Sequence, residues 1–265
     1  MSIRLAAFGG VYNNHLALAA TLADIARRAP EHAWCLGDLG GFGPSPEISA
    51  ALIRASGLPM LQGNYDHSIG HGLDDCGCGY TDPSDNAFAQ ASYEYTSANV
   101  SEATREWLRS LPREGRLVLE GRRVLLCHGS PRQTNEFLWD SRCSDAFLEW
   151  LCKAHECDVL LVTHTGLHWH RALPSGKHVV NVGAIGRPAH DGRTNVWYAE
   201  LTFDAGRVAV GFRPLEYDHE ALAREMEAES LPAEFVDTIR TGWWTTCLEN
   251  VPVRERMRQW REASG

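Results

Sequence analysis

The sequence lacks any run of about 18 uncharged apolar residues, which excludes an ordinary membrane-spanning helix. Its N-terminus also lacks the basic start and long apolar stretch of a signal peptide, so we expect a cytoplasmic protein. Basic residues are few: 25 Lys and Arg stand against 34 Asp and Glu, giving a net charge of −9. This balance argues against broad binding to nucleic-acid backbones but permits a small phosphorylated substrate held by a few local cations.

The eight cysteines include no C-x-x-C pair of the kind found in zinc ribbons and redox motifs. The one close pair, Cys76 and Cys78, has the spacing C-x-C. Because the chain shows no export signal, disulfides are not expected. We therefore predict reduced, structural thiols, with a metal or redox role for this pair as the alternative.

Strand-like apolar runs alternate with amphipathic segments of helical spacing over most of the chain. Strands are predicted at 3–8, 33–36, 59–61, 116–119, 123–127, 159–162, 178–181, 195–203 and 207–213, and helices at 15–28, 45–55, 86–98, 101–111 and 144–154. Parallel βα units come first and antiparallel strands later. This order predicts an α/β protein with two packed sheets and helices outside.

The C-terminal part of the sequence differs from the rest, because its pattern predicts helices and no strands. We predict a main domain over 1–217 and a helical extension over 218–265 packed on it. Asp218 is expected to cap the first helix of the extension, and Gly242 to end the second. Three tryptophans fall in this extension, Trp243, Trp244 and Trp260, and we expect them to pack the extension onto the body rather than to bind a ligand.

Four polar motifs follow apolar runs at 33–36, 59–61, 123–127 and 159–162. They are Gly37-Asp38, Gly63-Asn64-Tyr65-Asp66, Cys127-His128-Gly129 and Thr163-His164-Thr165. Carboxyl ends of parallel strands meet at one edge of a sheet, where sites are commonly built. One Asp, one Asn and two His are plausible ligands for a divalent transition metal.

In this order the motifs resemble those of the calcineurin-like metallophosphoesterases, and especially their small bacterial phosphodiesterase branch. The segments His128-Gly129-Ser130-Pro131 and 181–188, NVGAIGRP, also match, and the resemblance runs from about residue 3 to 215. It implies a four-layer α/β/β/α sandwich of two mixed sheets with flanking helices. It also implies a hydrolase that cleaves phosphoesters with two metal ions and an activated water.

Carried over residue by residue, the resemblance gives an uneven metal site. Asp38 matches the Asp that bridges the two metals, and Asn64, His128 and His164 match the other ligands of one of them. The remaining ligand positions of the other metal hold Gly10, Tyr12 and Gly166. The resemblance therefore implies a degenerate dinuclear site with one strongly bound divalent transition metal, which is Mn, Zn, Fe or Ni.

Two ways to compensate for the replaced ligands stay open. His168 lies two residues beyond Gly166 and is a possible substitute ligand. Gly9 and Gly10 are possible donors of backbone N–H groups to a phosphate, although no Gly-Lys-Ser/Thr follows them as in a P-loop.

Further residues are candidates for work on the substrate. Tyr65 stands where many family members have a catalytic His, and its ordinary pKa near 10 makes it a poor acid at neutral pH. Asp66 is expected to orient a neighbouring donor, and His67 is a candidate for proton transfer. Arg187 and Arg132 are candidates for pairing with phosphate oxygens, with solvated surface arginines as the alternative.

Two functions remain in competition. The first is a metal-dependent phosphoesterase, acting on phosphodiesters or phosphomonoesters with one tightly held ion and low activity. The second is a non-catalytic relative that binds a metal or a phosphorylated ligand and acts as a binding or regulatory protein. Retention of four ligands favours the enzyme, whereas the loss of one whole metal set favours the binding protein. An oligomer is compatible with either function.

Overall fold

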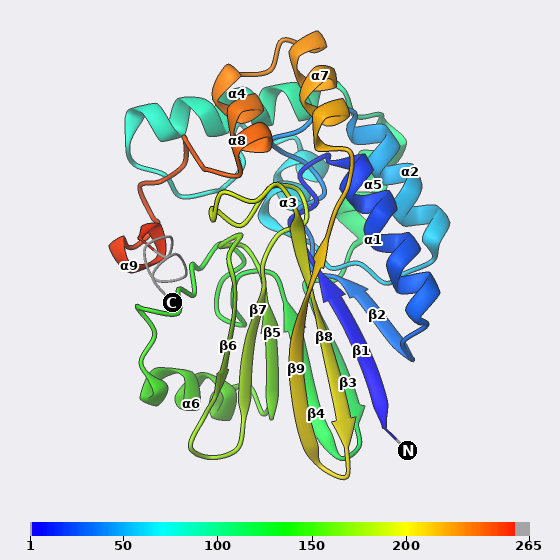
Figure 1. Ribbon diagram of the computed structural model, residues 1–265, viewed down its shortest axis with the longest axis vertical. Coiled ribbons are helices and arrows are strands. Elements are labelled where there is room, and N and C mark those ends of the chain that lie inside the picture. The colour runs from blue at the N-terminus through cyan, green and yellow to red at the C-terminus, as the bar shows by residue number, and fades with distance from the viewer. Residues whose placement is uncertain (1, 258–265) are drawn as a thin grey trace.

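The computed structural model describes residues 2–257, and its strands form two mixed sheets that pack face to face (Figure 1). The strands are β1 (Ile3–Phe8), β2 (His32–Cys35), β3 (Glu114–Leu119), β4 (Arg122–Cys127), β5 (Val159–Val162), β6 (His168–Ala172), β7 (His178–Val182), β8 (Val196–Asp204) and β9 (Arg207–Leu215). The first sheet has the order β2-β1-β8-β9 and the second β3-β4-β5-β7-β6. Each sheet combines parallel and antiparallel pairs.

Helices cover the outer faces of this pair of sheets and one end of it. They are α1 (His15–Arg28), α2 (Pro46–Ser56), α3 (Asn64–His71), α4 (Pro83–Ala98), α5 (Glu102–Ser110), α6 (Asp145–Ala154), α7 (His219–Ala228), α8 (Ala233–Thr241) and α9 (Val253–Arg256). In the described part of the chain, no helix combines the length and apolar composition that a bilayer span requires.

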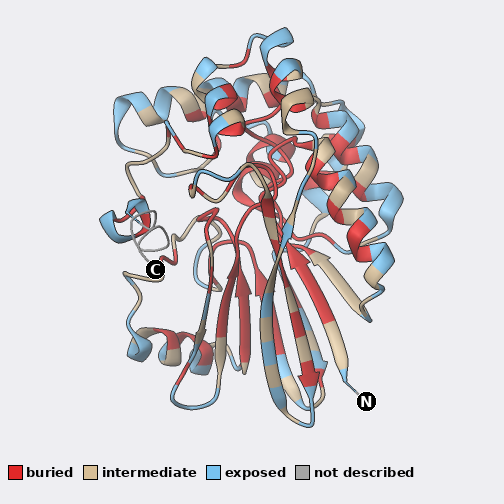
Figure 2. Ribbon diagram, in the orientation of Figure 1, coloured by how far each residue is buried: buried red, intermediate tan, exposed pale blue. Residues whose placement is uncertain are grey.

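The alternation of side chains along a strand explains the layers, because neighbouring residues point to opposite faces of a sheet. In β1, Leu5 and Ala7 enter the core between the sheets, whereas Ala6 and Phe8 pack toward α1 and α2. In β4, Leu126 faces the other sheet and neighbouring residues face α6. Figure 2 shows the resulting buried strands between helices with exposed outer faces. The predicted four-layer α/β/β/α sandwich is therefore confirmed.

The parallel strands place the predicted motifs at one edge of the sandwich. Strand β1 runs parallel to β2, and β4, β5 and β7 run parallel to one another. Each motif loop therefore leaves its strand at the same end, under α3 and α4 (Figure 1). This geometry brings together residues that are more than a hundred positions apart in the sequence.

The C-terminal extension shares a hydrophobic core with the loops at this edge. Asp218 caps α7 by accepting a hydrogen bond from Ala221 N, and Gly242 ends α8 in a left-handed conformation, as predicted. Buried side chains of α7 and α8 pack against Tyr12, Phe42 and Ala184. The division into domains at 217 stays a prediction, and Trp260 lies outside the described residues.

Some local predictions are wrong. The strand predicted at 59–61 is a single bridge between Met60 and Cys35, because Pro59 has no N–H and the segment is very short. Residues that follow it form α3, a helix that was not predicted. The edge strand β6, which pairs with β7, was not predicted either.

The prediction of reduced thiols at Cys76 and Cys78 is also wrong, because the structure joins them in a disulfide. Gly77 between them takes a positive φ of 63°, which lets the chain turn tightly enough for the two residues to meet. The other cysteines of the described chain are free. The C-x-C spacing alone does not predict this pairing, because the pairing depends on the turn at Gly77.

Candidate metal centre

The loop after β2 presents Asp38 at the bottom of the site. Asp38 has a positive φ of 58° and is almost fully buried. Its Oδ1 accepts a hydrogen bond from Tyr65 N at 3.0 Å, and its Oδ2 lies 3.0 Å from His128 Nε2. A Cβ at Gly63 would come within 2.2 Å of Oδ1, so only glycine permits this approach of the two loops. Burial raises the pKa of Asp38, but the proximity of His128 outweighs it and the pKa is lowered.

His128 is oriented by the backbone of the neighbouring sheet. Its Nδ1 lies 2.7 Å from Leu36 O, a geometry in which Nδ1–H donates and Nε2 is left for a ligand. Metal-binding histidines are typically fixed in this way by a carbonyl or carboxylate. Burial lowers the pKa of His128, but the nearby Asp38 raises it by more, so the net shift of this pKa is upward.

His164 completes a cluster of three possible ligands. One ligand atom each from Asp38, His128 and His164 lies within 4.8 Å of the other two. Like Asp38, His164 takes a positive φ, 64°, which is uncommon for residues other than glycine and recurs at functional sites. Burial, with a smaller contribution from His128, lowers the pKa of His164 to about 3, so the ring is neutral at neutral pH.

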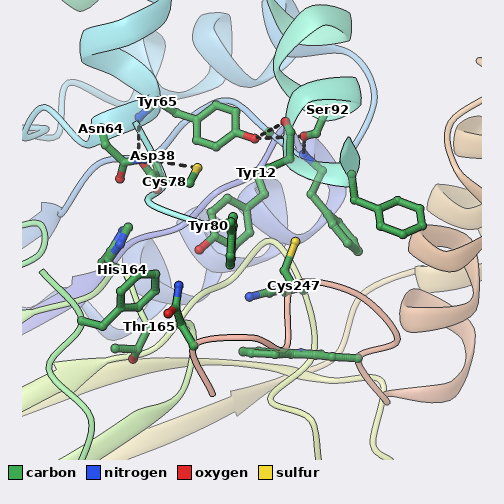
Figure 3. Close-up of a pocket in the computed structure, with 18 of the residues that line it drawn as sticks. Tyr12, Asp38, Asn64, Tyr65, Cys78, Tyr80, Ser92, His164, Thr165 and Cys247 are labelled. Atoms are coloured by element: carbon green, nitrogen blue, oxygen red, sulfur yellow. Dashed lines mark hydrogen bonds between the residues drawn. The ribbon is translucent and has the colours of Figure 1, made fainter. Parts of the chain in front are cut away.

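Asn64 faces the same cluster from the start of α3 (Figure 3). Its Nδ2 donates to Cys76 O at 2.9 Å, which leaves Oδ1 as the free group. Asn64 Oδ1 is buried without a hydrogen-bond partner among the described residues, whereas His164 turns its Nδ1 toward the cluster, 3.3 Å from His128 Nε2. Buried polar atoms are normally satisfied, and a bound ion is one accepted reason for an exception. This orphaned oxygen, with the Asp38 carboxylate and the two imidazoles, fits one divalent transition metal.

Asp66 supports this arrangement from behind. Its carboxylate accepts hydrogen bonds from the backbone N–H groups of Asp38, Leu39 and Gly63 at 2.8 to 2.9 Å. Burial, and then the nearby Asp38, raise the pKa of Asp66 to about 6. Asp66 therefore holds neighbouring backbone N–H donors, and a role for it in catalysis stays a prediction.

Tyr65 and His67 leave the start of α3 in different directions. The Tyr65 hydroxyl points away from Asp38 and lies 3.3 Å from both Ala89 O and Ser92 Oγ (Figure 3). Burial raises the pKa of Tyr65 well above its ordinary value, which makes proton transfer from it less favourable. His67 instead lines a second cavity together with Asn64 and His128. The position of His67 is thus compatible with the predicted proton transfer, whereas the Tyr65 hydroxyl is directed toward α4.

The three replaced ligand positions lie together on the opposite side of the cluster. A Cβ at Gly10 would meet the ring of Tyr12 at 2.9 Å, and a Cβ at Gly166 would meet the Trp244 ring at 3.0 Å. A cavity here is lined by Tyr12, Asp38, His164 and a group of aromatic side chains from the body and the extension (Figure 3). Aromatic rings thus occupy the space beside these positions.

The possible compensations for the lost ligands are not realised. His168 lies in β6 with its ring 4.8 Å from that of Trp197 and 4.6 Å from that of Phe212, so it is not part of the ligand cluster. The N–H of Gly10 donates to Gly37 O at 2.9 Å and is not offered to a phosphate.

The two candidate arginines have different surroundings. The Arg132 side chain is 45% exposed, lies 3.4 Å from Glu136 and sits over the Phe147 and Trp150 rings. Arg187 is buried at the cavity beside the ligand cluster. Arg187 lines the cavity beside Asp38 and His164, whereas Arg132 lines the second cavity together with Asn64 and His128, so the substrate-binding role of both residues stays a prediction.

Sequence reasoning did not assign Trp244 to the site. This residue is buried against the site loops, so the expectation that the tryptophans pack the extension holds for it. Its Nε1 donates to Pro188 O at 2.7 Å, next to Arg187. The Trp243-Trp244 pair was the only signal in the sequence, and it did not reveal this neighbour.

Comparison with known proteins agrees with these features. Residues 5–204 match the family model of the calcineurin-like phosphoesterase superfamily domain. The chain is 24% identical over 244 residues to an uncharacterized protein of Methanocaldococcus jannaschii, covering 86% of this chain and 93% of that protein. The fold is similar to the crystal structure of a metallophosphoesterase from Sphaerobacter thermophilus, with a TM-score of 0.69, 24% identity and coverage of 91% of this chain and 100% of that chain. It is also similar to a hypothetical protein from Pyrococcus horikoshii OT3, with a TM-score of 0.73, 22% identity and coverage of 91% and 98%.

Proposed function

This chain belongs to the calcineurin-like phosphoesterase superfamily, and from that premise we propose that it hydrolyses small phosphoesters with one tightly held divalent transition-metal ion. The observation that carries the proposal is the buried cluster of Asp38, His128 and His164, beside which Asn64 Oδ1 has no partner in the described chain. When bound, such an ion supplies a Lewis acid that activates water and polarises a phosphoryl oxygen.

The protein's own groups define the rest of the chemistry. His128 holds its ligand nitrogen in place through Leu36 O, and Asp66 fixes the loop of Asp38 through backbone amides. His67 lines the cavity that Asn64 and His128 also line, which supports a role for it in giving a proton to a departing oxygen. Burial, with His71 and Arg113 nearby, lowers the pKa of His67, which favours release of that proton.

One observation supports the alternative of a non-catalytic binding protein. The space beside Gly10 and Gly166 is closed by Tyr12 and Trp244, so the residues that replace the lost ligands do not rebuild a second metal site. A bound metal and phosphorylated ligand without turnover would then be the function. An enzyme with one metal ion stabilises the charge of the transition state less than an enzyme with two ions, so slow hydrolysis is expected.

The test measures metal content and hydrolysis on the same samples. The parent protein should bind about one Mn²⁺ or Zn²⁺ per chain by elemental analysis and hydrolyse bis(p-nitrophenyl) phosphate or p-nitrophenyl phosphate. His164→Ala should lose both properties, whereas His170→Gln, at an exposed position in β6, should keep both. Metal without hydrolysis of either compound would favour the binding protein. Hydrolysis that persists in His164→Ala would show that the activity arises elsewhere.

A further inference from the structure

Arg187 is a buried cation at the side of the site from which the metal ligands have been lost. We propose that its guanidinium takes the place of the second metal and binds phosphoryl oxygens of the substrate beside the single ion. This inference rests on the proposed function, because it assigns how the same site holds its substrate.

The charge of Arg187 is not neutralised within the described chain. The residue is 9% exposed, and no carboxylate among residues 2–257 forms an ion pair with it. Its Nε is buried without a hydrogen-bond partner in that part of the chain. Burial of an unpaired charge is costly. A guanidinium held in this state is suited to an anion that arrives from solution.

Trp244 holds this guanidinium in position. Arg187 Cζ lies 3.6 Å from the centroid of the Trp244 ring, and the Tyr12 and Phe42 rings lie at 5.7 and 6.0 Å. Contacts with aromatic faces stabilise a cation without neutralising its charge or occupying its N–H donors. The donors therefore remain available to a ligand.

Trp244 is itself fixed by two hydrogen bonds to the loop after β7, one from its indole and one from its backbone. Trp244 Nε1 donates to Pro188 O at 2.7 Å, and Trp244 N donates to His190 Nδ1 at 2.8 Å. Burial and then Arg187 lower the pKa of His190 to about 4. At neutral pH the ring is uncharged, so it can accept this bond and adds no competing positive charge.

The position of Arg187 relates it directly to the replaced ligands. A Cβ at Gly166 would lie 3.4 Å from Arg187 Nη2, and the Tyr12 ring is a neighbour of the guanidinium. Arg187 also lines the cavity that Asp38, Asn64 and His164 line. A side chain at 166 that reached for a metal would therefore meet the arginine. The planar fork of a guanidinium matches two oxygens of a phosphoryl group, which a point charge does not.

The test uses inorganic phosphate as the probe with metal-loaded full-length protein. We expect Arg187→Gln to raise the phosphate Kd, measured by calorimetry, at least about tenfold while metal content and thermal stability stay near those of the parent. Arg187→Lys should fall between the parent and Arg187→Gln because it keeps the charge but not the fork. The matched control is Arg54→Gln, since Arg54 also sits over an indole, 5.7 Å from the Trp107 ring centroid, but on α2. This variant should bind phosphate like the parent.

The outcomes separate this inference from the function it rests on. Metal retained with an unchanged phosphate Kd in Arg187→Gln overturns the inference and leaves the proposed function standing. Two tightly bound ions per parent chain also overturn it. A parent without metal that still binds phosphate through Arg187 supports the anion site and overturns the one-metal enzyme. If Arg187→Gln does not fold, an unchanged phosphate Kd in Arg187→Lys overturns the forked contact.

Discussion

The two histidines of the metal centre should respond differently to the same substitution. We predict that His128→Gln destabilises the metal-free protein strongly and that His164→Gln does not, although both abolish tight metal binding. The reason lies in their partners. His128 joins Leu36 O and the buried Asp38, whereas Nε2 of His164 has no partner in the described chain.

The magnitudes follow from these contacts. His128→Gln leaves the buried Asp38 carboxylate without the imidazole that lies 3.0 Å from it, a loss worth about 3–5 kcal/mol. For a chain of this size that corresponds to a fall in Tm of roughly 6–20 °C, at about 2–4 °C per kcal/mol. His164→Gln gives up a ring contact with Phe137 and the 3.3 Å contact between its Nδ1 and His128 Nε2. Together these are worth about 1–2 kcal/mol, so Tm should fall by roughly 2–8 °C.

Calorimetry in EDTA and again with added Mn²⁺ or Zn²⁺ measures both effects. A ligand at about 100 times its Kd stabilises the folded state by about 2.7 kcal/mol, so the parent Tm should rise by roughly 5–11 °C. Neither variant should show this rise. His170→Gln should behave like the parent in both conditions.

Equal losses of Tm in EDTA for the two variants would refute the difference in structural role. A metal-induced rise that survives in His164→Gln would refute its assignment as a ligand. Elemental analysis of the same samples distinguishes loss of metal from loss of fold.

Three further results are expected. Asp24→Asn should destabilise the protein by about 2 kcal/mol at pH 7 in urea unfolding. Burial raises the pKa of Asp24, but hydrogen bonds from Tyr198 and Arg28 lower it by more, so the net shift is downward. The ionised Asp24 therefore stabilises the folded protein above its unfolded pKa, and this contribution disappears as pH falls through the folded pKa. The gap between parent and variant should therefore narrow at pH 3, and an unchanging gap would contradict this. In initial-rate assays Tyr65→Phe should keep the parent kcat within about threefold, whereas His67→Gln should lower it about 10²-fold or more, and the reverse order would exchange their roles. Replacing both cysteines of the C-x-C pair by Ser should weaken metal binding about tenfold by loosening the carbonyl that orients Asn64, and unchanged affinity would mean that the loop holds without the disulfide.

The layers of the fold were predictable because apolar residues in the strands specify two buried faces. The helix at 15–28 was predicted to its ends, since Asn14 caps it as a side chain of that type should. Strand β6 was missed because its burial is irregular and its pairing depends on β7. Helix α3 was missed because its first turn carries the polar residues of the site instead of an apolar stripe.

Much of the metal centre was also predictable, because its side chains follow strand ends in a recognisable order. The direction of the Tyr65 side chain was not, since it is set by α4 through Ala89 and Ser92. Nor could the sequence place Trp244 over Arg187, because their contact depends on how the extension packs on the site loops. Both the direction of the Tyr65 side chain and the contact of Trp244 with Arg187 depend on tertiary packing, which a local sequence pattern does not predict.

The central position of β1 has a consequence for synthesis of the protein. This strand pairs with β2 on one side and with β8 on the other. At about 5–20 residues per second, a ribosome needs roughly 10–40 seconds to add the roughly 190 residues that separate β1 from β8. During that interval the nascent chain carries an apolar strand with an open edge, which is a template for unwanted pairing. Slower growth at low temperature, or a chaperone that shields the first strand, should therefore raise the yield of correctly folded protein.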